Sequence, residues 1–240
     1  MHHMKTIALG ILMTQAINAI NNIEIELRYE VLQPEQLSSF VAPLQKKHIK
    51  HDVDIYFDTP TDYLHKNGIY IRTRNNKKLD IKFNRACLDN PDLAIQDYCE
   101  EHSFTLPLQE KDLAKINQLL VSLNLKPMSI ASLENLISAN HFKEQCVVDK
   151  IRTSYQYKNF TICVDEVKNL GIFLEIELMA DTADNVAKVK QEMLHLIQGL
   201  DLKPIKTGYI NLLLRKKDFT HYLMGRFIMD EDKVYRNSNV

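Results

Sequence analysis

The sequence predicts an α+β fold with eight β-strands and five helices. Two observations predict this class. From Ile23 onward, apolar and polar residues alternate in eight separate segments, which is the pattern of strands with two chemically different faces. Apolar residues at helical spacing recur in the stretches between and after these segments. Eight strands are enough to close a sheet into a barrel.

The composition fits one compact domain. Of the 240 residues, 45% are hydrophobic, which is too many for a disordered chain, and 6 Gly and 7 Pro are too few for a fibrous one. The 30 Lys and Arg residues nearly balance the 31 Asp and Glu residues, and a net charge of -1 gives no global field to gather nucleic acid. Any anion site must therefore be built locally.

The strands fall into a group of five and a group of three. We expect them at residues 23–31, 52–58, 69–74, 78–83, 98–106, 146–155, 160–167 and 171–179. A helical insert of about 107–144 separates the two groups. No internal repeat or long Gly/Ser linker divides the chain, so the strands belong to one domain.

The helices have recognisable starts or apolar stripes. Pro34 can open a helix at its first turn, directly after the first strand. Leu113, Ile116 and Leu120 recur at helical spacing and need a surface to cover. The expected helices run from Pro34 onward and over 110–123, 129–140, 182–200 and 209–219. The tail, 216–240, is expected to be helical with a frayed end.

Two features of the sequence favour the cytoplasm. Residues 1–22 form an N-terminal extension that is a tag remnant, a helix or a weak signal-like segment, and its apolar stretch is too short to span a bilayer. The four cysteines include no CxxC pair, which predicts buried thiols in a reducing compartment: Cys87, Cys99, Cys146 and Cys163. We expect a cytoplasmic protein without a membrane partner, and export is the alternative.

Several strands carry rows of charged side chains. In strand 23–31 the alternation sets Glu24, Glu26 and Arg28 on the face opposite Ile25. Matching rows elsewhere are Arg72 with Arg74, Asp80 with Lys82, and Glu175 with Glu177.

These rows have two interpretations. One is a solvated sheet face with cross-strand ion pairs of roughly 0.2 to 1 kcal/mol each. The other is a water-filled lumen inside a closed sheet, because dry burial of so many ions would cost several kcal/mol each. Closely spaced carboxylates indicate a divalent cation, and clustered Arg and Lys indicate a polyanion. A metal-bound polyphosphate satisfies both sets.

The order of these motifs resembles a known family. The first strand reads Glu-Ile-Glu-Leu-Arg from Glu24 to Arg28, close to an ExExK motif with Arg in place of Lys. Further matches follow in the family order at 55–60, 64–74, 79–82, 150–152, 164–165, 171–177 and 206–213. Over about residues 23–215 the sequence resembles the CYTH superfamily, also called triphosphate tunnel metalloenzymes. This group includes thiamine triphosphatases, inorganic triphosphatases, RNA triphosphatases and class IV adenylyl cyclases.

The resemblance implies an eight-stranded antiparallel closed barrel, a triphosphate tunnel, with helices packed outside. It implies a tunnel domain over 23–215 and a C-terminal helical tail over 216–240. The implied catalytic residues, which would also hold Mg²⁺ or Mn²⁺, are Glu24, Glu26, Asp165, Glu175 and Glu177. The implied triphosphate-binding residues are Arg28, Arg72, Arg74, Lys82, Arg152 and Lys206, with Lys150 as a further candidate.

The fifth strand offers two acidic residues to such a tunnel. Either Glu100 or Glu101 can face inward. Apolar Tyr98, Phe104 and Leu106 share one parity, which favours Glu101, although a bulge would reverse the order.

The expected function is metal-dependent hydrolysis of thiamine triphosphate or inorganic triphosphate by in-line attack of water on the terminal phosphorus. The helical insert resembles the thiamine triphosphatase arrangement. The alternatives are a class IV adenylyl cyclase and a non-catalytic polyphosphate-binding or nucleotide-binding module. An RNA triphosphatase is disfavoured, because no basic strip offers a surface for RNA. The expected partner is therefore a small-molecule triphosphate and no nucleic acid polymer, with the chain a monomer or homodimer.

Other polar and aromatic residues are expected to have ordinary roles. Tyr70 and Tyr209 could touch an organic group on the substrate, but core packing is favoured. The histidines expected at the surface or in packing are His48, His51, His65, His102, His141 and His195.

Overall fold

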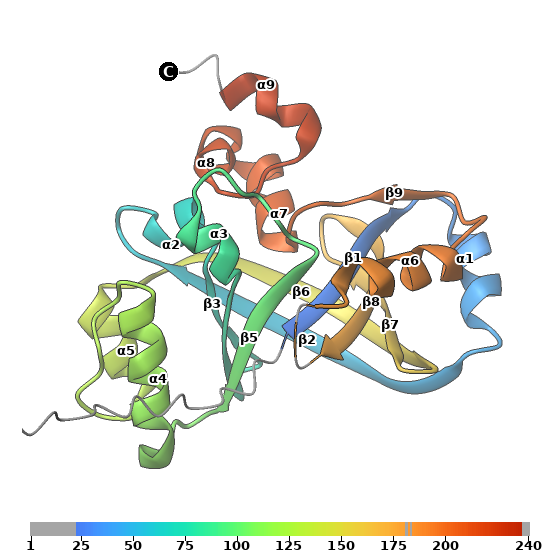
Figure 1. Ribbon diagram of the computed structural model, residues 1–240. Coiled ribbons are helices and arrows are strands. Elements are labelled where there is room, and N and C mark those ends of the chain that lie inside the picture. Colours follow the sequence, from blue (N-terminus) through green and yellow to red (C-terminus); the bar gives the residue numbers. More distant parts are fainter. Residues whose placement is uncertain (1–22, 181, 183, 237–240) are drawn as a thin grey trace, which may run out of the picture.

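The computed structural model describes residues 23–180, 182 and 184–236 (Figure 1). The expected N-terminal extension, 1–22, lies outside the described residues, as does the last part of the tail, 237–240. The strands are β1 (Ile23–Val31), β2 (Gln45–Asp58), β3 (Tyr70–Arg74), β4 (Lys78–Phe83), β5 (Tyr98–Thr105), β6 (Lys143–Tyr157), β7 (Phe160–Val167), β8 (Gly171–Ala180) and β9 (Leu202–Pro204).

Eight of these strands close into an antiparallel barrel. Neighbouring strands pair in the order β5-β4-β3-β2-β6-β7-β8-β1, and the additional pairing of β1 with β5 closes the ring. The short β9 pairs with the far end of β1, where Tyr29 lies opposite Pro204. The predicted fold class is confirmed.

Strands β2 and β6 extend beyond the predicted segments. They pair from Gln45 opposite Gln156 to Asp58 opposite Lys143. The first half of β2 is exposed, so both of its faces meet water and the sequence shows no apolar alternation there. Its regularity comes from backbone pairing with β6, which a single sequence does not reveal.

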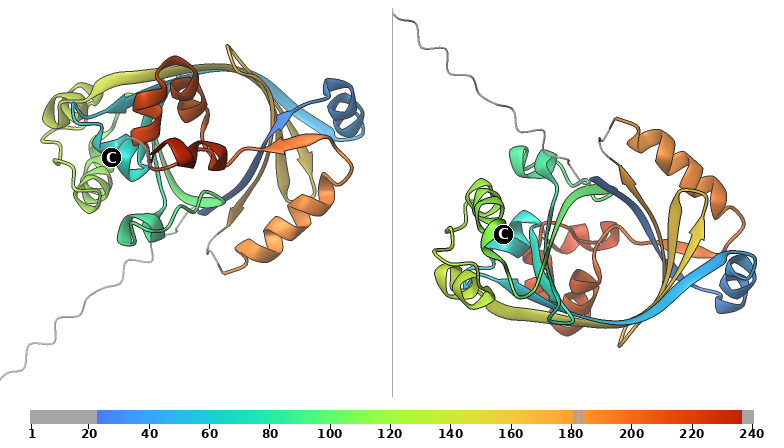
Figure 2. Two further views of the ribbon diagram at one scale, coloured as in Figure 1. Left: turned by 90° about the horizontal axis from the view of Figure 1, so that it is seen from above. Right: turned by 90° about the horizontal axis from the view of Figure 1, so that it is seen from below.

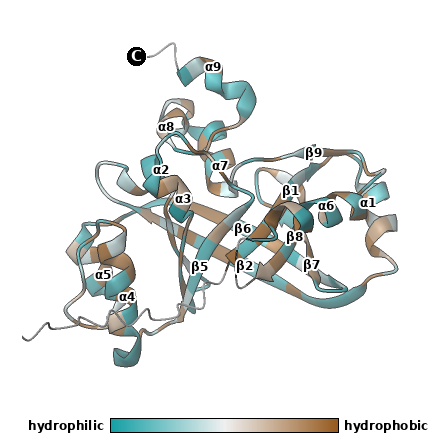
Figure 3. Ribbon diagram, viewed as in Figure 1, coloured by the Kyte–Doolittle hydropathy of each residue, from teal (hydrophilic) through white to brown (hydrophobic). Residues whose placement is uncertain are grey.

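The helices lie outside the barrel or across one end. Their bounds are α1 (Pro34–Val41), α2 (Tyr63–Asn67), α3 (Arg85–Asp89), α4 (Glu110–Ser122), α5 (Leu133–Asn140), α6 (Val186–Leu196), α7 (Tyr209–Lys217), α8 (Phe219–Met224) and α9 (Lys233–Arg236), with a 3-10 turn η1 (Asp230–Asp232). Helices α1 and α6 pack on the outer face of β1 and β8, and α4 and α5 cover β3 and β4. In Figure 3 the barrel strands carry both hydrophobic and hydrophilic segments, as two different faces require.

Helix α7 closes one end of the barrel. Tyr209 and Ile210 pack with Tyr56, Val148 and Phe173 in a core cluster at this end. Seen from above in Figure 2, the C-terminal helices lie across the barrel, and from below they lie behind the ring of strands. The predicted helix 209–219 is divided in two, because the Asp218 side chain caps α8 by accepting a bond from the His221 amide (3.0 Å).

The cysteines test one expectation drawn from the sequence. All four cysteines are free thiols; Cys87 and Cys163 are buried, whereas Cys99 and Cys146 are only partly buried. The expectation of four buried thiols is therefore correct for two of them. No helix in the described part of the chain is long and apolar enough to cross a membrane.

Candidate active site

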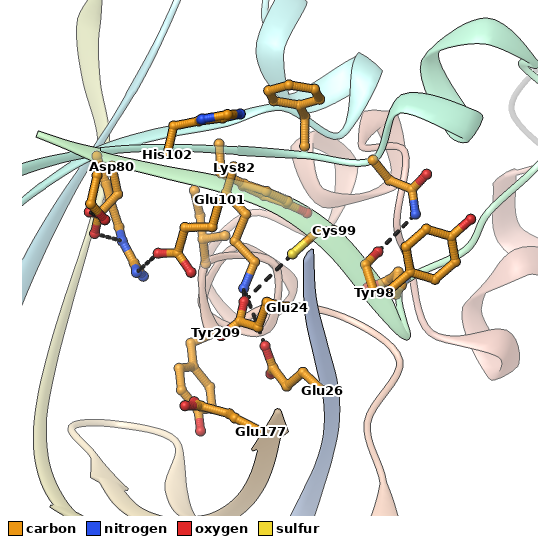
Figure 4. A pocket seen from close by; sticks show the side chains of 18 of the residues that line it. Glu24, Glu26, Asp80, Lys82, Tyr98, Cys99, Glu101, His102, Glu177 and Tyr209 are labelled. Atoms are coloured by element: carbon orange, nitrogen blue, oxygen red, sulfur yellow. Dashed lines mark hydrogen bonds and ion pairs between the residues drawn. The ribbon is translucent and has the colours of Figure 1, made fainter. Parts of the chain in front are cut away.

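The barrel encloses a charged cavity of about 440 Å³. Alternate residues of a strand point to the same face, so each lining strand contributes its inward set. The predicted site residues that line the cavity are Glu24, Glu26, Arg28, Arg72, Arg74, Lys82, Arg152, Glu175 and Glu177. Figure 4 shows Lys82 directed toward Glu24 and Glu26.

Strands β1 and β8 bring four carboxylates together. Their register sets Glu26 opposite Glu177 and Arg28 opposite Glu175, and Glu24 lies two residues before Glu26 on the same face. Burial raises the pKa of Glu177 to about 8, and the nearby carboxylates add to this effect against the opposing charge of Arg152. Burial and the neighbouring carboxylates therefore disfavour the ionised form of Glu177 unless a further cation is near.

Three cations contact this carboxylate wall. Lys82 pairs with Glu24 and, at 3.3 Å, with Glu26. Arg152 pairs with Glu175 and, at 2.9 Å, with Glu177. Arg28 bridges Glu26 and Glu175. The opposite charges of the tunnel thus neutralise one another within one cavity.

Asp54 anchors two arginines of the phosphate-binding set. Its carboxylate is 1% exposed and accepts bonds from Arg74 Nε (2.7 Å) and Nη2 (3.0 Å) and from Arg72 Nη1 (3.1 Å). Burial alone would raise the pKa of Asp54, but the charges of Arg72 and Arg74 outweigh it and bring the pKa down to about 2. Asp54 is thus an ionised support for both guanidinium groups.

Asp165 is a second anchor, which corrects its expected role as a metal ligand. It is fully buried, and its oxygens accept bonds from Lys150 Nζ (2.7 Å), Arg152 Nε and Nη2 (both 2.7 Å) and the Tyr209 hydroxyl (3.0 Å). Asp165 lies behind these side chains and does not line the cavity. Its charge holds Lys150 and Arg152 in position.

Lys206 does not reach the cavity, which corrects its expected role in triphosphate binding. Its side chain is 66% exposed and pairs with Asp230 at 2.9 Å. Alternation explains the difference, because Ile205 and Thr207 are buried on either side and Lys206 points outward. At this position the Thr207 carbonyl faces inward and accepts a bond from Arg28 Nη1 (2.7 Å).

Tyr209 lies among the cations at the closed end. The Arg28 Cζ atom is 4.6 Å and the Lys150 Nζ atom 5.0 Å from the centre of its ring. Its hydroxyl donates to Asp165, and its ring packs edge-on against Phe173. Tyr209 therefore combines the expected packing role with contacts to the charged site.

Sequence reasoning missed Asp54 and did not decide between Glu100 and Glu101. The alternation of Asp52, Asp54 and Tyr56 was the available signal for Asp54. Glu101 lies opposite Lys82 in the β4–β5 register, lines the cavity and is 3.5 Å from Arg72 Nη2. The apolar parity of β5 therefore favoured the residue that lines the cavity.

The acidic wall suits a hard cation in its chemistry. Among the described residues, no group of three His, Cys, Asp or Glu side chains is already gathered as a metal site. The possible metal ligands on β1 and β8 are nevertheless all carboxylates, which Mg²⁺ and Mn²⁺ prefer as protein ligands.

Comparisons with known proteins agree with this architecture. A "Putative adenylate cyclase" of Methanocaldococcus jannaschii is 25% identical over 138 residues, which cover 55% of this chain and 79% of that protein. A protein of Pyrococcus horikoshii has a similar structure, with a TM-score of 0.52, 24% identity, and coverage of 80% of this chain and 99% of that one.

A third similar protein is described by its activity. It comes from Hippeastrum and is called a "Putative adenylyl cyclase" that reveals "a dominant" triphosphatase activity. The TM-score is 0.51 with 16% identity, and the match covers 82% of this chain and 95% of that one. The CYTH domain family matches residues 22–208, which include every barrel strand. The chain therefore belongs to the CYTH domain family, which the order of its charged motifs had already indicated.

Proposed function

We propose that this protein is a divalent-metal-dependent triphosphatase that hydrolyses a small triphosphate, with thiamine triphosphate and inorganic triphosphate as the first candidates. One observation carries the proposal: a row of Arg and Lys side chains and a row of carboxylates face the same cavity of about 440 Å³. A triphosphate with its metal ion carries charges that match both rows.

The cationic row is positioned before any substrate binds. Asp54 holds Arg72 and Arg74 from behind, and Asp165 holds Lys150 and Arg152. Guanidinium groups bind phosphate oxygens in a bidentate manner and keep their charge at all ordinary pH values. Donors fixed in this way stabilise charge that develops on phosphate oxygens without further reorganisation.

The carboxylate row would hold the cation. Glu24, Glu26, Glu175 and Glu177 supply oxygen ligands from neighbouring strands. When bound, Mg²⁺ or Mn²⁺ supplies charge neutralisation at the phosphate oxygens and orients an attacking water. The chain itself contributes the ligands, the cations on the phosphate and a partly enclosed cavity.

The distribution of charge around the cavity supports hydrolysis at the terminal phosphate. Arg28 and Lys150 gather around Tyr209 at the end that α7 closes. The uncharged lining residues Phe83, Ile95 and Met179 belong to other parts of the wall. We therefore take the terminal phosphate to bind at the closed end, next to the β8 carboxylates.

An adenylyl cyclase is the second candidate, supported by the name of the Methanocaldococcus relative. Cyclisation needs attack on the α-phosphorus by a ribose oxygen, so it would require a different placement of the triphosphate. The Hippeastrum protein, which is described as having a dominant triphosphatase activity, supports hydrolysis as the first candidate.

The test is an incubation of the purified chain with Mg²⁺ or Mn²⁺ and, separately, tripolyphosphate, thiamine triphosphate and ATP. Orthophosphate, pyrophosphate and cyclic AMP are measured together. Orthophosphate release that a chelator abolishes is the expected result. Pyrophosphate with cyclic AMP would identify a cyclase, and tight binding without product would identify a binding module.

A further inference from the structure

Arg226 joins the C-terminal part of the chain to a loop of the barrel that lies far from it in the sequence. Its Nη2 atom donates to the backbone carbonyls of Cys87 (2.7 Å), Asn90 (3.0 Å) and Leu93 (2.6 Å). These carbonyls belong to residues 84–97 between β4 and β5, called here the mouth loop. Arg226 lies beyond the end of the family match at residue 208.

The backbone position of Arg226 is itself fixed. Its amide donates to the His65 carbonyl at 3.0 Å. The preceding Gly225 packs so closely against the His65 ring that a Cβ atom at this position would overlap with the ring. Glycine therefore allows the close approach that brings the Arg226 guanidinium to the mouth loop.

The mouth loop is tied to the barrel at both ends. At its start, the buried Asn84 accepts a bond from the Cys87 amide (3.2 Å) and donates to the Tyr98 carbonyl (2.8 Å). At its end, the Asp97 carbonyl accepts a bond from the Glu26 amide at 3.0 Å. Arg226 holds the middle of the loop between these two attachments.

The mouth loop forms an uncharged part of the cavity wall. Asn84, Ile95 and Gln96 line the cavity from the loop, and Phe83 and Met179 line it from β4 and β8. This lining contrasts with the charged row around Lys82. Figure 4 shows Tyr98 on the side of Cys99 away from Lys82 and Glu101.

This lining suits an organic group and not a bare phosphate. A phosphate gains little from Ile95 and Met179, whereas a heterocyclic ring gains from contact with their apolar surfaces. The Gln96 amide has a donor and an acceptor for the polar edge of such a ring. The lining therefore selects substrates that carry a ring on the triphosphate.

We infer that the mouth loop is a subsite for the heterocyclic organic group of the substrate, and that Arg226 is the residue that positions it. The inference rests on the proposed binding of a triphosphate in the same cavity. It goes further in favouring an organic triphosphate over inorganic triphosphate and in assigning a role to the C-terminal part of the chain.

The test compares ATP and thiamine triphosphate with tripolyphosphate in the full-length protein. Dissociation constants are measured by calorimetry, and kcat and KM are measured where turnover occurs. Arg226→Met should weaken both organic ligands about fivefold, the equivalent of one hydrogen bond of about 1 kcal/mol. Binding of tripolyphosphate should not change, because the charged row remains in place.

Two further variants separate positioning from folding. Arg226→Lys should restore most of the organic preference, because one ammonium group has three donors for the three carbonyls. Arg215→Met is the matched control, since Arg215 pairs with Glu231 and Asp232 in the C-terminal part of the chain and not with the mouth loop. Its ratio of organic to inorganic affinity should equal that of the unchanged protein.

A substitution in the lining of the subsite itself tests the inference even if Arg226→Met fails to fold. Gln96→Ala leaves the Arg226 bonds in place and should reduce affinity for one or both organic ligands without altering tripolyphosphate binding. Equal losses for all three ligands, or an unchanged protein that prefers tripolyphosphate, would overturn the subsite while leaving the triphosphatase proposal intact. Failure of all three ligands to bind would overturn both.

Discussion

At the scale of single residues, Glu177 carries the sharpest test of the proposed chemistry. Glu177→Gln removes one potential carboxylate ligand from the wall and keeps the side-chain size. We expect kcat to fall by about 100-fold or more, the loss typical of removing one group that stabilises the transition state. The melting temperature should hold at neutral pH, because a carboxyl group with a pKa of about 8 is largely uncharged there and Gln has nearly the same shape.

The matched control for this change is Glu166→Gln. Glu166 lies on β7 next to Asp165 but is exposed on the outer face of the barrel. Its replacement should leave turnover unchanged. If Glu177→Gln retained full metal-dependent turnover, the carboxylate wall would not be the metal site.

A second prediction at this scale contrasts two lysines. Lys150 is 3% exposed and lines the cavity, whereas Lys206 is two-thirds exposed and pairs with Asp230. Lys150→Ala should raise KM for tripolyphosphate several-fold, and Lys206→Ala should not change it. Steady-state kinetics at two salt concentrations measure both, and a larger effect at Lys206 would contradict the observed geometry.

These residues also show the limit of reading a site from sequence. Alternation along single strands selected inward-facing Glu24, Arg72 and Glu177, because strand period is a local property. It could not show that Asp165 is enclosed by Lys150 and Arg152, since that depends on side chains from other elements. Whether a charged residue faces a ligand or supports another residue is decided by tertiary contacts.

At the scale of secondary-structure elements, helix α7 joins the closed end of the barrel to the phosphate-binding cations. Tyr209 at its first position donates to Asp165 and lies against Arg28 and Lys150. Tyr209→Phe removes only the hydroxyl. It should lower the free energy of unfolding by about 1 kcal/mol, because a buried acceptor loses one bond.

The same helix gives a functional comparison. Tyr209→Phe should raise KM for tripolyphosphate modestly, whereas Tyr209→Leu should raise it further because the ring that positions Arg28 and Lys150 is lost. Denaturant unfolding and steady-state kinetics of the two variants provide the measurements. Identical kinetics for both would show that Tyr209 only packs the core.

Elements were predictable from the sequence where they carry an apolar pattern of their own. Helix α4 and strands β4 and β7 match their predicted ranges closely, because each buries one face. The exposed half of β2 and the five-residue helices α2 and α3 have no such stripe. Pairing with β6 supports this half of β2, and the side chains of Asp58 and Asn84 accept bonds from the first amides of α2 and α3. The closure of the barrel by α7 depends on contacts between residues far apart in sequence.

At the scale of the whole molecule, the barrel and the C-terminal helices meet at a buried histidine. His65 in α2 is 3% exposed, and its ring lies against that of His221 in α8, with the ring centres 5.2 Å apart. The His65 Nε2 atom is 3.1 Å from the His221 carbonyl. Burial lowers the pKa of His65 from 6.5 to about 4, so the folded protein keeps this ring neutral under ordinary conditions.

This histidine predicts how stability depends on pH. Between pH 6.5 and 4 the unfolded chain binds a proton at residue 65 that the folded chain does not, so the contribution of His65 to stability is complete above pH 6.5 and falls as pH decreases. The full loss corresponds to about 3 kcal/mol. His65→Gln should flatten this part of the profile of unfolding free energy against pH, whereas His195→Gln, an exposed change on α6, should not. A slope that persists in His65→Gln would assign the acid sensitivity to another group and leave the contact between α2 and α8 insensitive to pH.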